Sequence, residues 1–313
     1  MSKGKYPEKK LANLIIAGVN KAGSTSLFHY LSAHPDICGS RDKETCYFLP
    51  VLYQETVPPI TEYESQFSQC TTQKYRLEAT PGYVTGGEKM AVTISETLGD
   101  AKIIIILKDP VERLISFYKR KKATLQLPKE MSFEEFVTKC RKMNSNDLKL
   151  QENHLYSALQ TGEYDTFLEP WLQQFGDNIK IVFFDDLKKD ALKFMNNLSE
   201  WLKIDSSFYK DFDFEVKNKS MNYKNQALQQ FAVNANRAGQ RFWRSNPVIK
   251  KNLMALYYKF NGASFGRDEI DTATVNILKN YYLAHNMRLD LLLSRYGINE
   301  NKPSWLEPVT QPA

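Results

Sequence analysis

The sequence has few cysteines and histidines and no long hydrophobic run. Its 313 residues include four cysteines, without a CxxC pair, and four histidines, without the spacing of metal ligands. These absences argue against a zinc-binding framework. No stretch approaches the roughly twenty apolar residues of a membrane span, and no signal-peptide core follows the lysine-rich start. We therefore expect reduced cysteines in a cytoplasmic protein with neither a membrane partner nor a bound metal.

Internal repeats and low-complexity segments are also missing. Hydrophobic residues make up 42% of the chain and charged residues 25%, as in an ordinary globular protein. The formal net charge of +6 mildly favours anionic ligands, but it is too small to indicate a nucleic-acid partner. The composition leaves the oligomeric state open.

Apolar segments alternate with helical patterns from residue 14 to about 202. Continuous hydrophobic runs are typical of buried parallel strands. Strands are expected at 14–17, 75–77, 102–107 and 179–184, and helices at 24–32, 62–67, 88–98, 110–122, 133–139, 153–160, 164–175, 191–201 and 272–294. This order predicts an α/β fold in one domain over 1–313, with a parallel sheet flanked by helices. Its core would span 12–203, and 204–313 would hold a flexible basic segment and C-terminal helices.

The first expected strand leads into a turn that suits an anion. The strand ends at Gly18, Lys21 and Gly23 follow, and the hydroxyl residues 24–26 open and cap a helix. Backbone N–H groups at a helix start have no partner within the helix and attract anions. The lysine adds a positive charge beside them. We therefore predict a phosphate site here; the alternative is a plain strand-to-helix turn with a solvated lysine.

The residue order in this turn departs from the nucleotide-kinase pattern GxxxxGK[ST]. In that pattern the lysine follows the second glycine, whereas Lys21 precedes Gly23 by two residues. The order argues against an ATP-hydrolysing loop. It does not argue against phosphate binding, because the strand-turn-helix geometry supplies the backbone donors.

A second basic segment follows the most apolar strand, 102–107. Lys108 comes directly after this strand, and Asp109-Pro110 then starts a helix. Arg113 and Ser116 are three residues apart and therefore share a face of that helix.

Together, the motif at 21–25 and the segment 108–116 resemble the sulfotransferases that use 3′-phosphoadenosine 5′-phosphosulfate (PAPS). The resemblance implies a P-loop-like α/β fold and PAPS as the donor, with no metal required. The first motif would bind the 5′-phosphosulfate and the second the 3′-phosphate. The implied 5′ residues are Lys21, Ala22, Gly23, Ser24, Thr25 and Ser26, and the implied 3′ residues are Lys108 and Ser116.

Further segments resemble the heparan-type branch of that family, namely 34–36, 43–48, 78–83 and 162–175. Three positions depart from the pattern of that branch. Lys108 replaces an arginine, Cys46 a histidine and Ala79 a lysine. Lysine keeps the charge of arginine but loses its bidentate fork. The acceptor is therefore not carried over from the heparan enzymes.

The resemblance also implies roles in the transfer. Lys21 would stabilise the leaving phosphate and Glu44 would act as general base, unless Glu44 is a surface residue paired with Lys43 or Lys21. His154 is the alternative base. The candidates for acceptor contact are Tyr47, Phe48, Glu78, Tyr83 and His154, with ordinary core packing as the alternative for the aromatic residues.

Each of two further basic segments has two possible roles. Lys219 and Lys224 lie in an aperiodic stretch that either closes over the nucleotide or is a solvated linker. The run 119–122 either lines the cleft or is a solvated helix end. The resemblance thus implies sulfuryl transfer from PAPS to a hydroxyl or amine of a small-molecule natural product or a saccharide. The alternatives are an ATP-dependent small-molecule kinase and a non-catalytic nucleotide-binding module.

Overall fold

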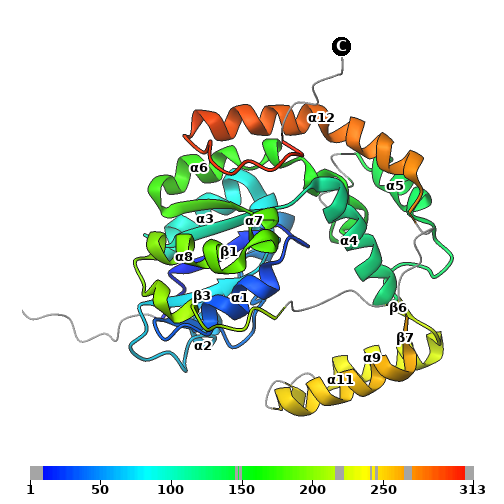
Figure 1. Ribbon diagram of the computed structural model, residues 1–313, viewed down its shortest axis with the longest axis horizontal. Helices are drawn as coiled ribbons and strands as arrows, with labels where there is room; N and C mark the ends of the chain where they lie inside the picture. Colours follow the sequence, from blue (N-terminus) through cyan, green and yellow to red (C-terminus); the bar gives the residue numbers. More distant parts are fainter. Residues whose placement is uncertain are drawn as a thin grey trace, which may run out of the picture.

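The structure is a computed structural model that describes residues 10–144, 147, 150–215, 222–239, 242–243, 246–263 and 270–306. Its centre is a five-stranded parallel sheet with the order β2-β3-β1-β4-β5 (Figure 1). The strands are β1 (Leu14–Gly18), β2 (Ile37–Gly39), β3 (Tyr75–Ala79), β4 (Lys102–Leu107) and β5 (Ile179–Phe183). The predicted α/β class with a parallel sheet is confirmed.

The central strands form because their side chains are apolar on both faces. All residues of β1 are buried, and the stretch from Ile103 to Leu107 in β4 has no exposed surface. Ile16 of β1 lies opposite Ile104 of β4 on one side and Ala79 of β3 on the other. Parallel strands end at the same edge, so the segments that leave β1 and β4 are neighbours in space.

Helices surround the sheet and extend beyond it (Figure 1). They are α1 (Ser24–Ser32), α2 (Ile60–Ser65), α3 (Gly87–Leu98), α4 (Pro110–Ala123), α5 (Phe133–Arg141), α6 (Glu169–Phe175), α7 (Phe184–Lys189), α8 (Ala191–Leu202), α9 (Gln226–Ala238), α11 (Pro247–Asn261) and α12 (Thr272–Arg295). Short 3-10 turns connect them at Leu49–Tyr53, Tyr83–Gly86, Gly176–Asn178 and Ser206–Tyr209. The predicted helices 24–32, 110–122 and 191–201 agree with α1, α4 and α8 to within one residue at each end.

Three local expectations are wrong. Residues 153–160 form the 3-10 turns Gln151–Asn153, Tyr156–Ala158 and Gln160–Gly162 instead of one helix. The span 164–175 is divided into a 3-10 turn, Tyr164–Thr166, and α6, because Pro170 has no N–H and therefore fits only the first turn of a helix. The cap of α1 is Gly23, and no side-chain hydroxyl caps this helix.

The expectation of four reduced cysteines is also wrong. Cys38 of β2 and Cys70, which follows α2, form a disulfide with 5.7 Å between their Cα atoms. They are 32 residues apart in sequence, and the return of the chain past α2 brings them together. Cys46 and Cys140 are free, the first exposed and the second buried.

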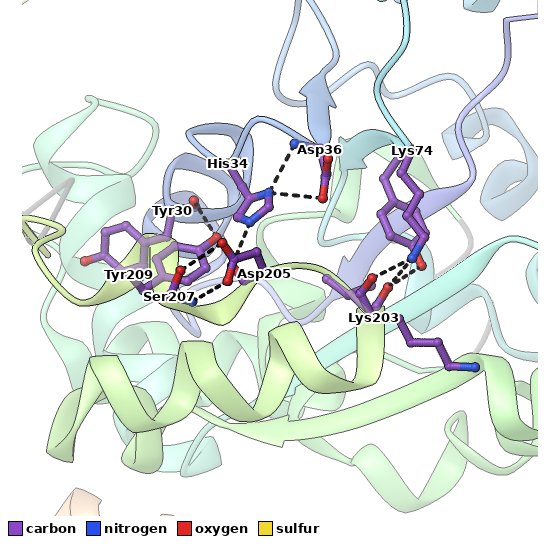
Figure 2. Close-up of polar contacts among 10 residues, drawn as sticks. Tyr30, His34, Asp36, Lys74, Lys203, Asp205, Ser207 and Tyr209 are labelled. Atoms are coloured by element: carbon purple, nitrogen blue, oxygen red, sulfur yellow. Dashed lines mark hydrogen bonds and ion pairs between the residues drawn. The ribbon is translucent and has the colours of Figure 1, made fainter.

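The segment after α8 is fixed against the β2–β3 edge by polar contacts (Figure 2). His34 Nε2 donates to the Asp205 carbonyl at 2.9 Å, and His34 Nδ1 accepts from the Asp36 N–H at 3.1 Å. Tyr209 donates to the carbonyl of Tyr30 at 3.0 Å. These bonds use both ring nitrogens of a buried histidine, so His34 has a structural role.

The second half of the chain has its own packing. Side chains of α4, α5 and α12 form a hydrophobic cluster beside the main core. A two-stranded antiparallel pair, β6 (Asn222–Tyr223) with β7 (Gly262–Ala263), carries α9 and α11 away from the sheet (Figure 1). We call residues 222–263 the arm.

The disulfide predicts the outcome of thiol titration in denaturant. Without reductant, only Cys46 and Cys140 should react with a thiol reagent, because Cys38 and Cys70 are oxidised. After reduction all four cysteines should react. The variant Cys70→Ser should release Cys38 and give one more reactive thiol than the unreduced parent. Reaction of all four cysteines in the freshly purified, unreduced protein would contradict the pairing.

Candidate functional site

The loop between β1 and α1 requires a glycine. Gly23 has a φ of +92°, a conformation that side chains disfavour, and a Cβ at this position would lie 2.8 Å from the Phe184 ring. Phe184 itself is the first residue after β5. The close approach lets α1 begin at Ser24, so the N-terminus of this helix lies at the loop where an anion was predicted.

Lys21 lies in this loop within a positive field. The pKa of its ammonium group is lowered to about 8, mainly by burial and then by the charges of Arg120 and Lys108. The charge of Glu44 acts in the opposite direction. A buried ammonium group beside other cations is stabilised when an anion binds among them.

Lys108 reaches the same place from β4. Its ammonium nitrogen lies 4.7 Å from the centre of the Phe184 ring and 3.2 Å from a carboxylate oxygen of Glu112. The N–H of Val19 donates to the Ile106 carbonyl at 2.9 Å, which joins the exits of β1 and β4 directly. The two basic segments predicted from sequence therefore lie at one edge of the sheet, with Phe184 contacting both.

The start of α4 has the predicted cap. Asp109 Oδ1 accepts from the N–H groups of Val111 and Glu112 at 2.7 and 3.1 Å. Arg113 is fully buried and donates from Nη2 to the Ala158 carbonyl, so it supports the fold instead of facing a ligand. Ser116 is half-buried on the same helix.

A cavity of about 710 Å³ adjoins the loop. Val19 and Asn20 of the loop line it, together with the predicted residues Glu44 and His154. Lys121 and Phe117 of α4 also line it. The cavity thus extends from the loop between β1 and α1 to the 3-10 turns after α5.

Glu44 is 54% exposed at the rim of this cavity. Its carboxylate lies 3.0 Å from the ammonium nitrogen of Lys43, so the surface ion pair considered from sequence is present. Burial lowers the pKa of Lys121, Arg120 lowers it further, and Glu44 opposes both effects. Glu44 therefore also lies in the field of the cavity lysines. Lys121 belongs to the basic run 119–122. Its place on the cavity wall supports the hypothesis that this run lines the cleft.

Four of the five predicted acceptor residues are buried. Tyr47, Phe48, Glu78 and Tyr83 have at most 6% exposure and belong to the core behind the cavity. The fifth, His154, is exposed at the cavity, and its Nδ1 donates to the Gln151 carbonyl at 2.9 Å. Direct contact of the buried four with an acceptor would need the core to open.

Glu78 organises this buried layer. Four hydroxyls donate to its carboxylate, from Thr45, Tyr63, Thr80 (2.9 Å) and Tyr83 (2.7 Å). Burial raises the pKa of Glu78, and these hydrogen bonds oppose the rise. Thr80 also accepts from the N–H of Cys46 at 3.2 Å. The network therefore fixes the segment that carries Glu44, a role that the sequence motif around Glu78 did not reveal.

The two residues expected to close over the nucleotide have different outcomes. Lys219 lies outside the described residues. Lys224 is exposed at the root of the arm, where its N–H donates to the Asn261 carbonyl at 2.9 Å. Within the described ranges, no group of three or more histidine, cysteine or carboxylate residues could hold a metal ion.

Comparison with known proteins agrees with this geometry. A model of the sulfotransferase domain matches residues 11–254. The membrane-associated sulfotransferase kil1 of Dictyostelium discoideum is 36% identical over 134 residues, which are 41% of this chain and 27% of that protein. The mouse heparan sulfate glucosamine 3-O-sulfotransferase 3B1 is 30% identical over 167 residues, 53% of this chain and 39% of that protein. The chain thus matches well under half the length of either relative.

A solved structure supports the fold. The sulfotransferase from Alicyclobacillus acidocaldarius superposes with a TM-score of 0.56 at 23% identity, covering 73% of this chain and 94% of that chain. The domain match spans most of the sequence and includes both basic segments at the edge of the sheet. The chain belongs to the sulfotransferase family.

Proposed function

We propose that this protein transfers a sulfuryl group from PAPS to a hydroxyl or amine of a small-molecule or saccharide acceptor. The observation that carries the proposal is that Lys21 and Lys108 lie at one sheet edge, within electrostatic range of each other, and that residues of the Lys21 loop line a cavity. Two cationic groups at neighbouring strand ends suit a ligand with negative charge at both ends, as PAPS has.

The residues present fit the donor. The α1 N-terminus and Lys21 would hold the 5′-phosphate oxygens, and Gly23, with its φ of +92°, lets the chain turn into α1 against Phe184. Lys108 and Ser116 would hold the 3′-phosphate. PAPS, when bound, supplies an activated sulfuryl group and leaves adenosine 3′,5′-bisphosphate. Lys21 would neutralise the charge that develops on that leaving group.

Glu44 is the proposed general base. It lines the cavity and lies in the electrostatic field of Lys21 and Lys121, so an acceptor in the cavity would present its hydroxyl or amine near both groups. The carboxylate would accept the proton as the acceptor oxygen or nitrogen bonds to sulfur. His154, on the same cavity, is the alternative base.

The cavity wall narrows the acceptor class. Leu49, Val51 and Leu52 give it an aliphatic side, while Lys89 and Lys121 give it cations. An acceptor with an apolar part and an anionic or polar part would match this wall. The heparan sulfate acceptor named for the mouse relative makes a saccharide one reasonable choice.

The test is turnover with PAPS and a panel of hydroxyl and amine acceptors, followed by the Glu44→Gln variant on an acceptor that the parent sulfates. Loss of the base should lower kcat by about a hundredfold or more, because proton removal contributes that order of rate. Binding of adenosine 3′,5′-bisphosphate, measured by calorimetry, should not change. Glu55→Gln, on the exposed loop beside the cavity, is the matched control and should keep the parent rate.

Three results would contradict the proposal in whole or in part. Near-normal turnover of Glu44→Gln would assign proton transfer to another group. His154 would then be the first residue to substitute. Thermal stabilisation by ATP but not by adenosine 3′,5′-bisphosphate would point to a kinase. Stabilisation by the bisphosphate, with no transfer to any acceptor of the panel, would support a binding module without catalysis.

The lowered pKa of Lys21 predicts a pH dependence of donor binding. Above pH 8 the free protein loses the Lys21 proton, and binding of an anion must restore it. The dissociation constant of adenosine 3′,5′-bisphosphate should therefore rise by up to about tenfold for each pH unit above 8. Below that pH the lysine is already charged, so Lys21 should cause no further change of the dissociation constant with pH.

Substitution separates this effect from a general response to pH. Lys21→Arg should flatten the rise because arginine stays protonated. Lys102→Arg is the control, since burial also lowers the pKa of Lys102 but this residue begins β4, at the opposite edge of the sheet. A steep rise that persists in Lys21→Arg would show that another group takes up the proton.

A further inference from the structure

The arm is joined to the body by polar groups on its inner side. Gln229 of α9 donates to the Ala123 carbonyl at the end of α4 at 2.5 Å. Tyr257 of α11 donates to the Gln229 side chain, and Asn261 donates to the Tyr257 hydroxyl at 2.6 Å. Polar residues thus occupy the position where a helical hairpin normally buries apolar side chains.

The apolar side chains of α11 face outward instead. Ile249, Leu253, Leu256 and Phe260 are spaced by four, three and four residues, so they form one stripe along the helix. Their exposed fractions lie between 46% and 68%. Soluble helices bury such a stripe, and within the described residues nothing covers this one.

The second helix of the arm repeats the feature. Leu228 and Phe231 of α9 are one turn apart and are 43% and 71% exposed. No described residue of α9 is buried. The arm therefore presents apolar side chains from two helices, which is more than the scattered exposure of an ordinary surface.

The charge of this region has one sign. Between Glu215 and Asp268 the sequence has no acidic residue and ten lysines and arginines. On the described part of the arm, Lys250 and Lys259 of α11 flank the apolar stripe at positions about a quarter turn to either side. A partner for this surface must accept apolar side chains and supply negative charge.

We infer that the arm docks on the surface of membranes that contain anionic lipids. The apolar stripes would enter the boundary between headgroups and acyl chains, and the lysines would contact the headgroups. A second arm would bring like charges together. A polyanionic saccharide or nucleic acid would match the charge but offers no apolar phase for leucine and phenylalanine. An anionic bilayer satisfies both requirements.

The docking is peripheral and departs from the expectation of no membrane partner. Helices able to cross a bilayer are absent from the described part of the chain. The arm root and the cavity share the end of α4, because Ala123 accepts the bond from Gln229 and Lys121 lines the cavity. A docked arm would therefore hold the cavity near the lipid surface. The inference stands independently of the transfer reaction.

The test is co-sedimentation of the full chain with vesicles, without substrate. One set is phosphatidylcholine alone and the other is phosphatidylcholine mixed with phosphatidylserine. Binding to the mixed vesicles only, weakening as salt is raised, is expected because the lysines contribute through a screened field. The double variant Lys250→Gln with Lys259→Gln should bind about thirtyfold more weakly.

A matched pair of variants tests the apolar stripe. Leu256→Ser with Phe260→Ser should weaken vesicle binding by at least about tenfold, with no loss of thermal stability because both side chains are exposed. Met287→Ser with Leu291→Ser, on α12, removes side chains of similar exposure from another face and should leave binding unchanged.

Three outcomes would overturn the inference. The first is failure of the parent to bind mixed vesicles. The second is equal loss of vesicle binding in the α11 and α12 variants. The third is a dimer in sedimentation analysis that Leu256→Ser with Phe260→Ser dissociates, without vesicle binding by the parent, which would assign the stripe to a second copy of the chain.

Discussion

The gathering of positive charge at the carboxyl edge of β1 and β4 is the constraint on which the rest of the structure depends. Lys21 is buried there at a cost that its lowered pKa records, and Lys108 lies close enough to lower that pKa further. A fold that only needed stability would not keep two ammonium groups at one edge of its sheet. Their position is explained if an anion with two charged ends completes the site.

The surrounding structure holds the groups that would act on this anion. The Cys38–Cys70 disulfide closes the stretch of chain that contains Glu44, and the Glu78 hydroxyl network includes the neighbouring Thr45. Arg113 binds the carbonyl of Ala158, a residue of the cavity wall. Buried polar groups with several partners are costly to disturb, so these contacts favour one arrangement of the cavity. The site thus combines a positively charged sheet edge with a cavity wall that these contacts hold in place.

Much of this arrangement could be predicted from the sequence, because local patterns determine it. The β-branched run at 103–106 could only be a buried strand, and Asp109-Pro110 could only begin a helix, so Lys108 had to lie at a strand exit. The order of Lys21 and Gly23 after an apolar strand predicted the loop between β1 and α1. The resemblance to the family then supplied the ligand, which spacing alone does not.

Tertiary packing determined what the sequence could not show. The disulfide joins residues that only the path around α2 brings together. Tyr47 and Tyr83 looked equally suited to a pocket or a core, and their stacking around Tyr63 and Phe48 placed them in the core. The apolar surface of the arm could not be predicted, because its hydrophobic residues recur at ordinary helical spacing. Only their exposure distinguishes them from the residues of a core helix. A search for membrane-spanning runs cannot detect such a surface.

The central claim is that Lys108 and the loop at Lys21 bind opposite ends of one nucleotide. Calorimetric titration of adenosine 3′,5′-bisphosphate and adenosine 5′-monophosphate into the parent and Lys108→Ala tests it directly, because the second ligand lacks only the 3′-phosphate. The account predicts that Lys108→Ala weakens the bisphosphate but hardly changes the monophosphate, with a coupling of about 1–2 kcal/mol. Equal weakening of both ligands by Lys108→Ala would contradict it.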